Sequence, residues 1–193
     1  MTNLPHPADP SQPNTSFPAS TGLPVPHSQP AVSPTTSGST DDRTGLHIRP
    51  ARPEETEGLA TLILAMAWES EGMQLNPDTL LAGIRAVFNN PALGTYWVAE
   101  LGQVPIACTL ITLEWSDWHN ASYWWIQSLY IQPEHRGKGV FEQILHTLEQ
   151  AAASTGGREL RLYVEKANAR AIRVYERNGF DGEHYHYMSK SLI

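Results

Sequence analysis

A short glycine-punctuated basic segment carries the clearest chemistry in the sequence. It reads Arg136-Gly137-Lys138-Gly139-Val140-Phe141 and lies between a strand pattern that ends at Ile131 and an amphipathic helix pattern. A turn of this kind directs successive backbone N–H groups outward, and a helix start adds partial positive charge. With two cationic side chains, the segment favours a pyrophosphate ligand. It is neither a P-loop nor a GxGxxG motif, and a plain strand-to-helix connection would also contain such glycines.

A second segment, about thirty residues farther along the chain, adds specificity. It reads Asn168-x-x-Ala171-x-x-x-Tyr175-x-x-x-Gly179-Phe180. Together with the turn, this spacing resembles the signature of the GNAT superfamily of N-acetyltransferases. The resemblance covers residues 46 to about 190 and leaves the start of the chain outside it.

The resemblance implies an α+β fold and a bound acetyl-CoA co-substrate. In the GNAT fold, a twisted mixed sheet of six to seven strands is flanked by about four helices. The sheet splays between its fourth and fifth strands, here the strand ending at Ile131 and the strand 160–164, and acetyl-CoA inserts in the gap. The resemblance also implies that backbone groups of Leu129, Tyr130 and Ile131 contact the pantetheine and the acetyl carbonyl, while residues 136–141 hold the pyrophosphate.

Two residues of the second segment gain roles from the same resemblance. Asn168 would hydrogen-bond near the pantetheine, and Tyr175 would protonate the departing CoA thiolate. The two positions are seven residues apart, or two helical turns, so both side chains can face one cleft. A hydroxyl about 3 Å from the thiolate eases its departure by general acid catalysis. The alternative role for Tyr175 is core packing of its helix on the sheet.

Two positions depart from the family pattern. The turn usually ends in a small residue, where this chain has Phe141. That side chain either points inward and leaves its N–H free or reshapes the pyrophosphate pocket. Some family members carry a general-base Glu on the strand before the turn, and by register that position is Trp125.

Aromatic residues mark the expected acceptor side. All six tryptophans lie between residues 68 and 125, the half of a GNAT fold that forms this side. Four are candidate substrate contacts: Trp115, Trp118, Trp124 and Trp125. Successive strand residues point to opposite faces, so at most one of the last two lines the cleft. Membership of the core is the alternative for each ring.

Charge is divided between the two halves of the sequence. Residues 54–117 hold nine acids and one base, whereas residues 136–177 hold eight bases and five acids. An acidic, aromatic acceptor side favours a cationic amine. The candidates for a general base or ammonium anchor are Glu69 and Glu71, followed by Glu114 and Asp117.

The hydrophobic pattern predicts the elements that position these residues. Two helices, 53–72 and 76–90, follow a short strand at 46–49 and precede three strands at 95–101, 105–115 and 123–131. A helix from 141 to 156, a strand at 160–164, a helix at 168–178 and a closing strand pair from Phe180 complete the order. This succession indicates an α+β or mixed-sheet domain over residues 45–193.

Residues 1–44 differ in composition from the rest. They hold nine of the fifteen prolines, seven Ser and seven Thr, or 23 of 44 positions. Too little apolar surface is present to offset the entropy of ordering, so a disordered tail is predicted. The alternative is a docking segment, which a partner would recognise as extended Pro-rich chain.

Composition excludes several function classes. A net charge of -7 and a pI near 5.6 argue against nucleic-acid binding. No apolar stretch is long enough to span a membrane, and the start lacks the features of an export signal. One cysteine, Cys108, favours a cytoplasmic protein without disulfides, and no His or Cys spacing suggests a metal.

The sequence thus predicts an acetyl-CoA-dependent N-acetyltransferase acting on a small cationic or aromatic primary amine by direct attack in a ternary complex. The predicted partner is a small-molecule amine, with a homodimer left open. A non-catalytic acyl-CoA-binding module of the same fold is the competing class. A protein N-terminal or lysine acetyltransferase is the competing enzyme.

Overall fold

A computed structural model describes residues 39–41, 45–182 and 187–192. Apart from residues 39–41, the predicted tail lies outside the described residues. Within the described part of the chain, no helix is long and apolar enough to cross a membrane.

The described residues form a six-stranded mixed sheet in sequential order. Its strands are β1 (Ser39–Asp41), β2 (Leu46–Pro50), β3 (Thr95–Leu101), β4 (Val104–Ser116), β5 (Ala121–Ile131) and β6 (Glu159–Leu162). Neighbouring strands are antiparallel except for β5 and β6, which are parallel. The mixed sheet with flanking helices confirms the predicted fold class, and five of its six strands are among those expected from the sequence.

The sheet opens between β5 and β6, as predicted. The two strands pair from Tyr123↔Glu159 to Ile126↔Leu162, and β5 then continues to Ile131 without β6. The β4–β5 register shifts at the same place, between Leu110 and Ile111, so that Gln127 is an extra residue on β5. Such a bulge bends a strand and increases its twist, which turns the end of β5 away from β6.

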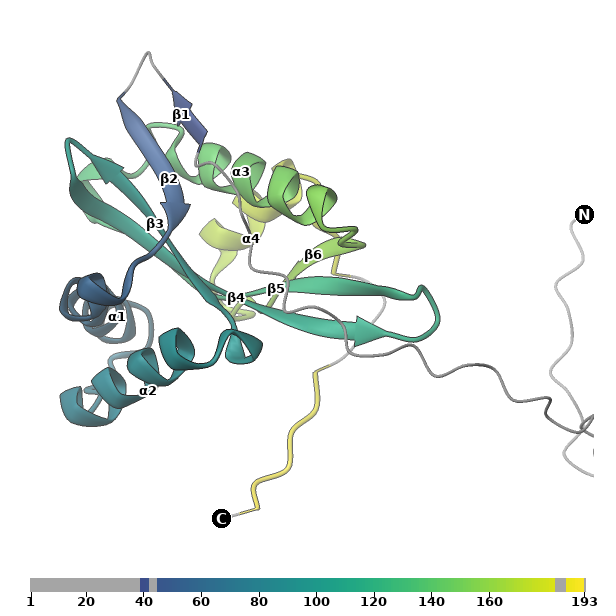
Figure 1. The fold of residues 1–193 in the computed structure, drawn as a ribbon, viewed down its shortest axis with the longest axis horizontal. Helices are drawn as coiled ribbons and strands as arrows, with labels where there is room; N and C mark the ends of the chain where they lie inside the picture. The colour runs from purple at the N-terminus through teal and green to yellow at the C-terminus, as the bar shows by residue number, and fades with distance from the viewer. Residues whose placement is uncertain (1–38, 42–44, 183–186, 193) are drawn as a thin grey trace, which may run out of the picture. The chain divides into compact units, whose positions relative to one another are not determined.

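Helices cover the two faces of the sheet, as Figure 1 shows. On one side lie α1 (Thr56–Glu71) and α2 (Pro77–Asn89), and on the other lies α3 (Val140–Ser154). Helix α1 ends at Gly72, whose φ of 63° is the left-handed C-terminal conformation that glycine favours. The predicted cap of α2 is confirmed, because the Asn76 side chain accepts a hydrogen bond of 2.9 Å from the Thr79 N–H.

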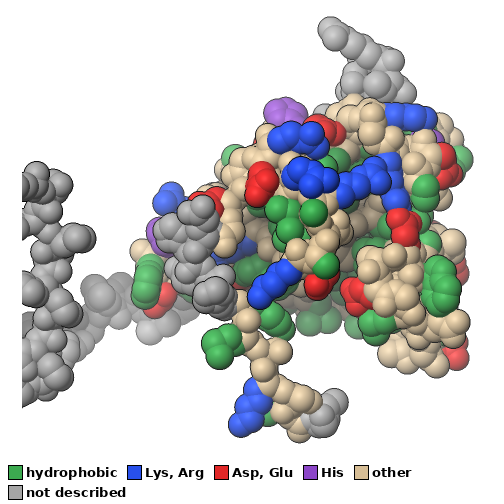
Figure 2. All heavy atoms as spheres, turned by 180° about the vertical axis from the view of Figure 1, so that it is seen from behind, with side chains coloured by type: hydrophobic (Ala, Val, Ile, Leu, Met, Phe, Trp, Pro, Cys, Tyr) green, Lys and Arg blue, Asp and Glu red, His purple; other side chains and the backbone are tan. Residues whose placement is uncertain are grey.

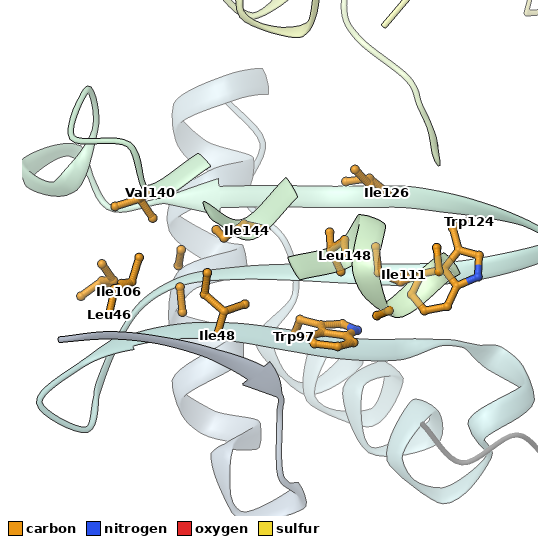
Figure 3. Packing of buried hydrophobic residues seen from close by; sticks show 14 residues of the cluster. Leu46, Ile48, Trp97, Ile106, Ile111, Trp124, Ile126, Val140, Ile144 and Leu148 are labelled. Carbon is orange, nitrogen blue, oxygen red and sulfur yellow. The ribbon is translucent and has the colours of Figure 1, made fainter. Parts of the chain in front are cut away.

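Two hydrophobic clusters hold the layers together. Beneath α3, Trp97, Ile111 and Trp124 from the strands pack with Ile144 and Leu148, as Figure 3 shows. On the opposite face, apolar residues of α1 and α2 pack on β3, β4 and β5; this cluster includes Leu59, Leu62, Ile63, Ile84, Val98, Cys108 and Tyr130. The sheet is therefore covered on both faces where its strands are antiparallel.

A charged network fixes the start of α1 to the sheet. The Arg49 guanidinium donates to Glu55 at 2.7 Å and to Glu100 at 2.6 Å, and the side chains of all three are largely buried. Glu55 belongs to the single 3-10 turn Pro53–Glu55 that leads into α1. The Arg49 hydrogen bond lowers the pKa of Glu55 from its ordinary value of 4.5 to about 2.

The ends of the sheet differ from the sequence-based expectation. The strand expected from Phe180 onward is not formed in residues 180–182 or 187–192, and residues 183–186 lie outside the described part. Instead β1, from the predicted tail, pairs with β2 as the sixth strand. Strand β6 ends at Leu162 rather than Val164, because β5 bends away after Ile126 and no longer offers it a pairing partner.

Candidate active site

The basic turn forms an anion-binding geometry at the start of α3. A 3-10 turn, Pro133–His135, follows β5, and then Gly137 and Gly139 take left-handed φ values of 69° and 79°. A side chain at these positions is strained, whereas glycine is not. Within the described part of the chain, no backbone N–H from residue 137 to 142 has a hydrogen-bond partner, and Gly139 begins α3 without a side-chain cap. These N–H groups are available to an anionic ligand.

Arg136 is held by protein groups rather than left open. Its Nε donates to the Ile131 carbonyl at 2.7 Å, and its two terminal nitrogens donate to the Glu69 carboxylate, one of them at 2.8 Å. The guanidinium carbon also lies 5.3 Å from the centre of the Tyr130 ring, and the Tyr130 hydroxyl donates to Glu69 at 3.3 Å. Arg136 therefore connects the last turn of α1 to the end of β5.

The pairing alters the chemistry expected of Glu69. The Arg136 hydrogen bonds lower the pKa of Glu69, with the charge of Arg170 adding to the effect. A carboxylate with a lowered pKa is a weaker base. Glu71, two residues later, is exposed and has no hydrogen-bond or ion-pair partner among the described residues.

Lys138 supplies the free positive charge of the turn. Its side chain is exposed, and no carboxylate of the described residues pairs with it. Figure 2 shows Lys and Arg side chains gathered on one face of the molecule. The basic sequence half contributes exposed Arg170, Arg173 and Arg177 from α4 (Ala169–Arg177). The charge division predicted from the sequence thus includes an exposed basic helix.

Helix α4 carries the second motif. The Asn168 side chain caps this helix by accepting a hydrogen bond of 3.0 Å from the Ala171 N–H, which leaves its amide N–H groups for other partners. Tyr175 is half-buried and packs edge-to-face against Phe141 and Phe180, with 5.7 Å between ring centres in both pairs. Burial raises the pKa of Tyr175, and its hydroxyl has no hydrogen-bond partner among the described residues.

The structure shows which way the Phe141 side chain points. Its side chain is only 9% exposed and contacts Tyr175, so the ring points inward while its N–H stays free. Val140 is buried in the cluster beneath α3. Leu129 and Ile131 also pack against this cluster, while Tyr130 is buried on the opposite face, beside Glu69. All three lie on the part of β5 that has separated from β6.

The candidate acceptor tryptophans separate into different environments. Trp124 is buried in the cluster beneath α3, on the strand face opposite to that of Trp125. Trp125 is half-buried, and its indole N–H donates to Glu114. Trp115 and Trp118 lie at the end of the β4–β5 hairpin and are 52% and 87% exposed, so they do not enclose a cleft in this structure.

A row of stacked groups surrounds Trp125. The Arg161 guanidinium carbon lies 3.3 Å from the centre of the Tyr123 ring, Trp125 stacks on Tyr163 at 4.6 Å, and Tyr163 meets Tyr187 edge-to-face at 5.1 Å. Arg161 also pairs with Glu159 at 2.6 Å. Sequence reasoning missed this row. The available signal was the spacing of two residues between Tyr123 and Trp125, and between Arg161 and Tyr163, which places each pair on one face of its strand.

Cys108 lies in the core, where burial raises its pKa to about 12. No group of three or more His, Cys, Asp or Glu side chains that could hold a metal ion occurs in the described residues.

The turn and the second motif both lie within a match to a known protein family. A family model for the acetyltransferase (GNAT) family matches residues 59–180. The chain belongs to the GNAT family. The match contains both the turn and the Asn168–Phe180 segment, and it leaves residues 1–44 outside.

Similar proteins of known name agree with this GNAT membership. A solved structure of a possible acetyltransferase from Clostridium difficile 630 is 32% identical, with a TM-score of 0.72, and the match covers 77% of this chain and 98% of that one. An aminoglycoside N-acetyltransferase in complex with CoA has a TM-score of 0.64 over 82% of this chain and 99% of that one; at 14% identity, it shows the fold alone.

The curated relatives match over shorter segments. A mycothiol acetyltransferase from Corynebacterium aurimucosum is 26% identical over 129 residues, which is 65% of this chain and 42% of that protein. The chain spans less than half the length of the curated relatives that it matches.

Proposed function

We propose that this chain is an N-acetyltransferase that moves an acetyl group from acetyl-CoA to a small primary amine. The observation that carries the proposal is the run of unpartnered N–H groups at residues 137–142, placed beside a sheet that opens after Ile126. A pyrophosphate satisfies such N–H groups, and the opening leaves one edge of β5 without a strand partner. The CoA bound to the aminoglycoside acetyltransferase supports the same ligand for this fold.

The proposed acetyl-CoA contacts combine this geometry with the roles that the GNAT pattern implies. Backbone N–H groups of Gly137, Gly139, Val140 and Phe141 bind the pyrophosphate, and Lys138 adds positive charge. Backbone groups of Leu129, Tyr130 and Ile131 bind the pantetheine and stabilise the oxyanion of the acetyl group. Asn168 contributes its free amide donors at the start of α4. Arg136 acts here by fixing the shape of the turn through Ile131 and Glu69.

Tyr175 is the general acid of the proposed reaction. The amine nitrogen attacks the thioester carbonyl, a C–N bond forms, and the C–S bond breaks. The sulfur takes the Tyr175 proton, and the amine loses a proton to a base. Because burial raises the pKa of Tyr175, the phenol remains protonated at neutral pH until the CoA thiolate departs. Cys108 is too deeply buried and too weakly acidic to form an acyl-enzyme.

Glu71 is the better of the two candidate bases. Glu69 is occupied by Arg136 and Tyr130, whereas Glu71 is exposed at the last position of α1. In direct transfer the base removes the ammonium proton before attack, and the nitrogen loses its second proton after the C–N bond forms, which lets the Tyr175 phenolate regain a proton.

The aromatic row marks the acceptor side. The last β5–β6 pair is Ile126↔Leu162. Trp125 precedes Ile126 and Tyr163 follows Leu162, so their stacked rings lie where the sheet opens. Arg161 already occupies the face of Tyr123 and pairs with Glu114 at 3.8 Å, so the amine is recognised by the exposed ring surface near Tyr163.

The test is release of CoA thiol from acetyl-CoA by the full chain with a panel of small amines. Amine-dependent release supports the proposal. Stabilisation by acetyl-CoA in thermal unfolding, without release on any amine or on N-terminal peptides, would instead favour the non-catalytic binding module. No stabilisation by acetyl-CoA would contradict both.

A further inference from the structure

Phe141 stands where the family pattern has a small residue, and its ring has a specific contact. The side chain is buried at the second position of α3, and its ring meets Tyr175 at an interplanar angle of 61°. Edge-to-face pairs at this separation are favourable and directional. The bulky residue therefore faces the proposed general acid rather than the anion-binding N–H groups.

No hydrogen bond among the described residues holds the Tyr175 hydroxyl in place. None of the nine residues of α4 is fully buried, and the Tyr175 hydroxyl donates to no group of the described residues. The Tyr175 ring lies against both Phe141 and Phe180, and the interplanar angle between Tyr175 and Phe180 is 65°. No hydrogen bond among the described residues orients the phenol, so its orientation depends on packing, in which these two ring contacts are directional.

We infer that Phe141 is a positioning residue that sets the orientation of Tyr175 for proton transfer. The inference rests on the proposed function for the role of Tyr175, but the contact itself can be tested without turnover. Phe180 lies three residues after the end of α4, and its backbone N–H donates to the Tyr175 carbonyl at 3.1 Å, so it belongs to the same local turn as Tyr175. Phe141 belongs to α3 and is the partner that ties the phenol to the CoA turn.

The first test observes the Tyr175 ring directly. The full chain is labelled with 3-fluorotyrosine, and the ¹⁹F resonance missing from Tyr175→Phe identifies position 175. In Phe141→Ala this resonance should move toward that of solvent-exposed fluorotyrosine and should titrate at lower pH, because the ring loses its cover. Phe141→Leu, which keeps apolar volume, should shift it less. A resonance unchanged in both variants overturns the inference, whether or not the protein is an enzyme.

The second test uses turnover. Phe141→Ala should lower kcat roughly tenfold to a hundredfold, as expected for a small misplacement of a catalytic group, while the KM for acetyl-CoA changes less than about twofold. In a Tyr175→Phe background, the same substitution should cause little further loss. Equal losses in both backgrounds would show that Phe141 acts independently of Tyr175.

A matched control separates positioning from stability. Ile144 is buried on α3 in the cluster beneath the helix, one turn beyond Phe141. Ile144→Val should lower the unfolding temperature with little change in kcat or in the position-175 resonance. If Ile144→Val reproduces the kinetic loss of Phe141→Leu at equal loss of stability, the role of Phe141 is structural only.

Discussion

Glu69 and Glu71 are two residues apart, yet their different environments give them different roles. Glu69 receives two hydrogen bonds from Arg136 and one from Tyr130, so its charge is already used to join α1 to β5. Glu71 has no such partner among the described residues and faces solvent at the end of α1. The sequence alone could not separate them, because the partner of Glu69 lies 67 residues away.

Substitution of each acid by Gln tests this assignment. Glu71→Gln should lower kcat about a hundredfold, the usual contribution of a general base. Glu69→Gln should lower kcat less than about threefold, because the Gln side chain still accepts a hydrogen bond from Arg136. Steady-state rates at saturating amine measure both. A larger loss in Glu69→Gln than in Glu71→Gln would reverse the two roles.

At the scale of elements, the join between β5 and α3 combines two functions. Its left-handed glycines let the chain turn sharply, and they also leave the N–H groups of residues 137–142 free. A Cβ added at Gly139 would meet no protein atom within 4 Å, so open space lies beside the turn. Gly156, after the other end of α3, has a similar φ of 73° and similar open space.

These two glycines form a matched pair for measuring acetyl-CoA binding. Gly139→Ala and Gly156→Ala should each lower the unfolding free energy by roughly 1–2 kcal/mol, the strain of a left-handed Ala. Only Gly139→Ala should weaken acetyl-CoA binding in a calorimetric titration, by about tenfold or more. Equal Kd values for the two variants would show that the turn does not bind the pyrophosphate.

At the scale of the whole molecule, stability depends on the charged network around Arg49. Glu55 is ionised in the fold down to a pKa of about 2, compared with its ordinary 4.5. A lowered pKa contributes stability above pH 4.5 that is lost as pH falls toward 2. With its side chain only 14% exposed, Glu55 accounts for on the order of 2–3 kcal/mol.

Replacement of Arg49 should remove this pH dependence. Arg49→Met is expected to lower the unfolding free energy at pH 7 and to flatten its decline between about pH 5 and 2, because Glu55 then loses the partner that keeps it ionised. Arg85→Met, which removes an exposed pair with Glu57, should change little. Denaturant unfolding over this pH range gives the measurement, and a decline of unchanged steepness in Arg49→Met would assign it to other carboxylates.

Most of the fold followed from local patterns, whereas the site depended on contacts between distant segments. Alternating apolar residues, the Asn76 cap and the glycine turn predicted the central strands, α2 and the start of α3 correctly. The expected strand after Phe180, which residues 180–182 and 187–192 do not form, and the added β1 concern the edges of the sheet, where propensity alone does not determine pairing. The Arg136–Glu69 pair, the ring contacts of Tyr175 and the row around Trp125 join residues whose neighbours are set only by tertiary packing.

The central claim is acetyl transfer to an amine with Tyr175 as the acid. The most direct measurement follows free CoA and acetylated amine together, by thiol titration and mass spectrometry, for the full chain and for Tyr175→Phe. The account predicts equal amounts of both products, with kcat about a hundredfold lower in the variant and a similar Kd for acetyl-CoA. Thiol release without acetylated amine, or an unchanged kcat in Tyr175→Phe, would contradict it.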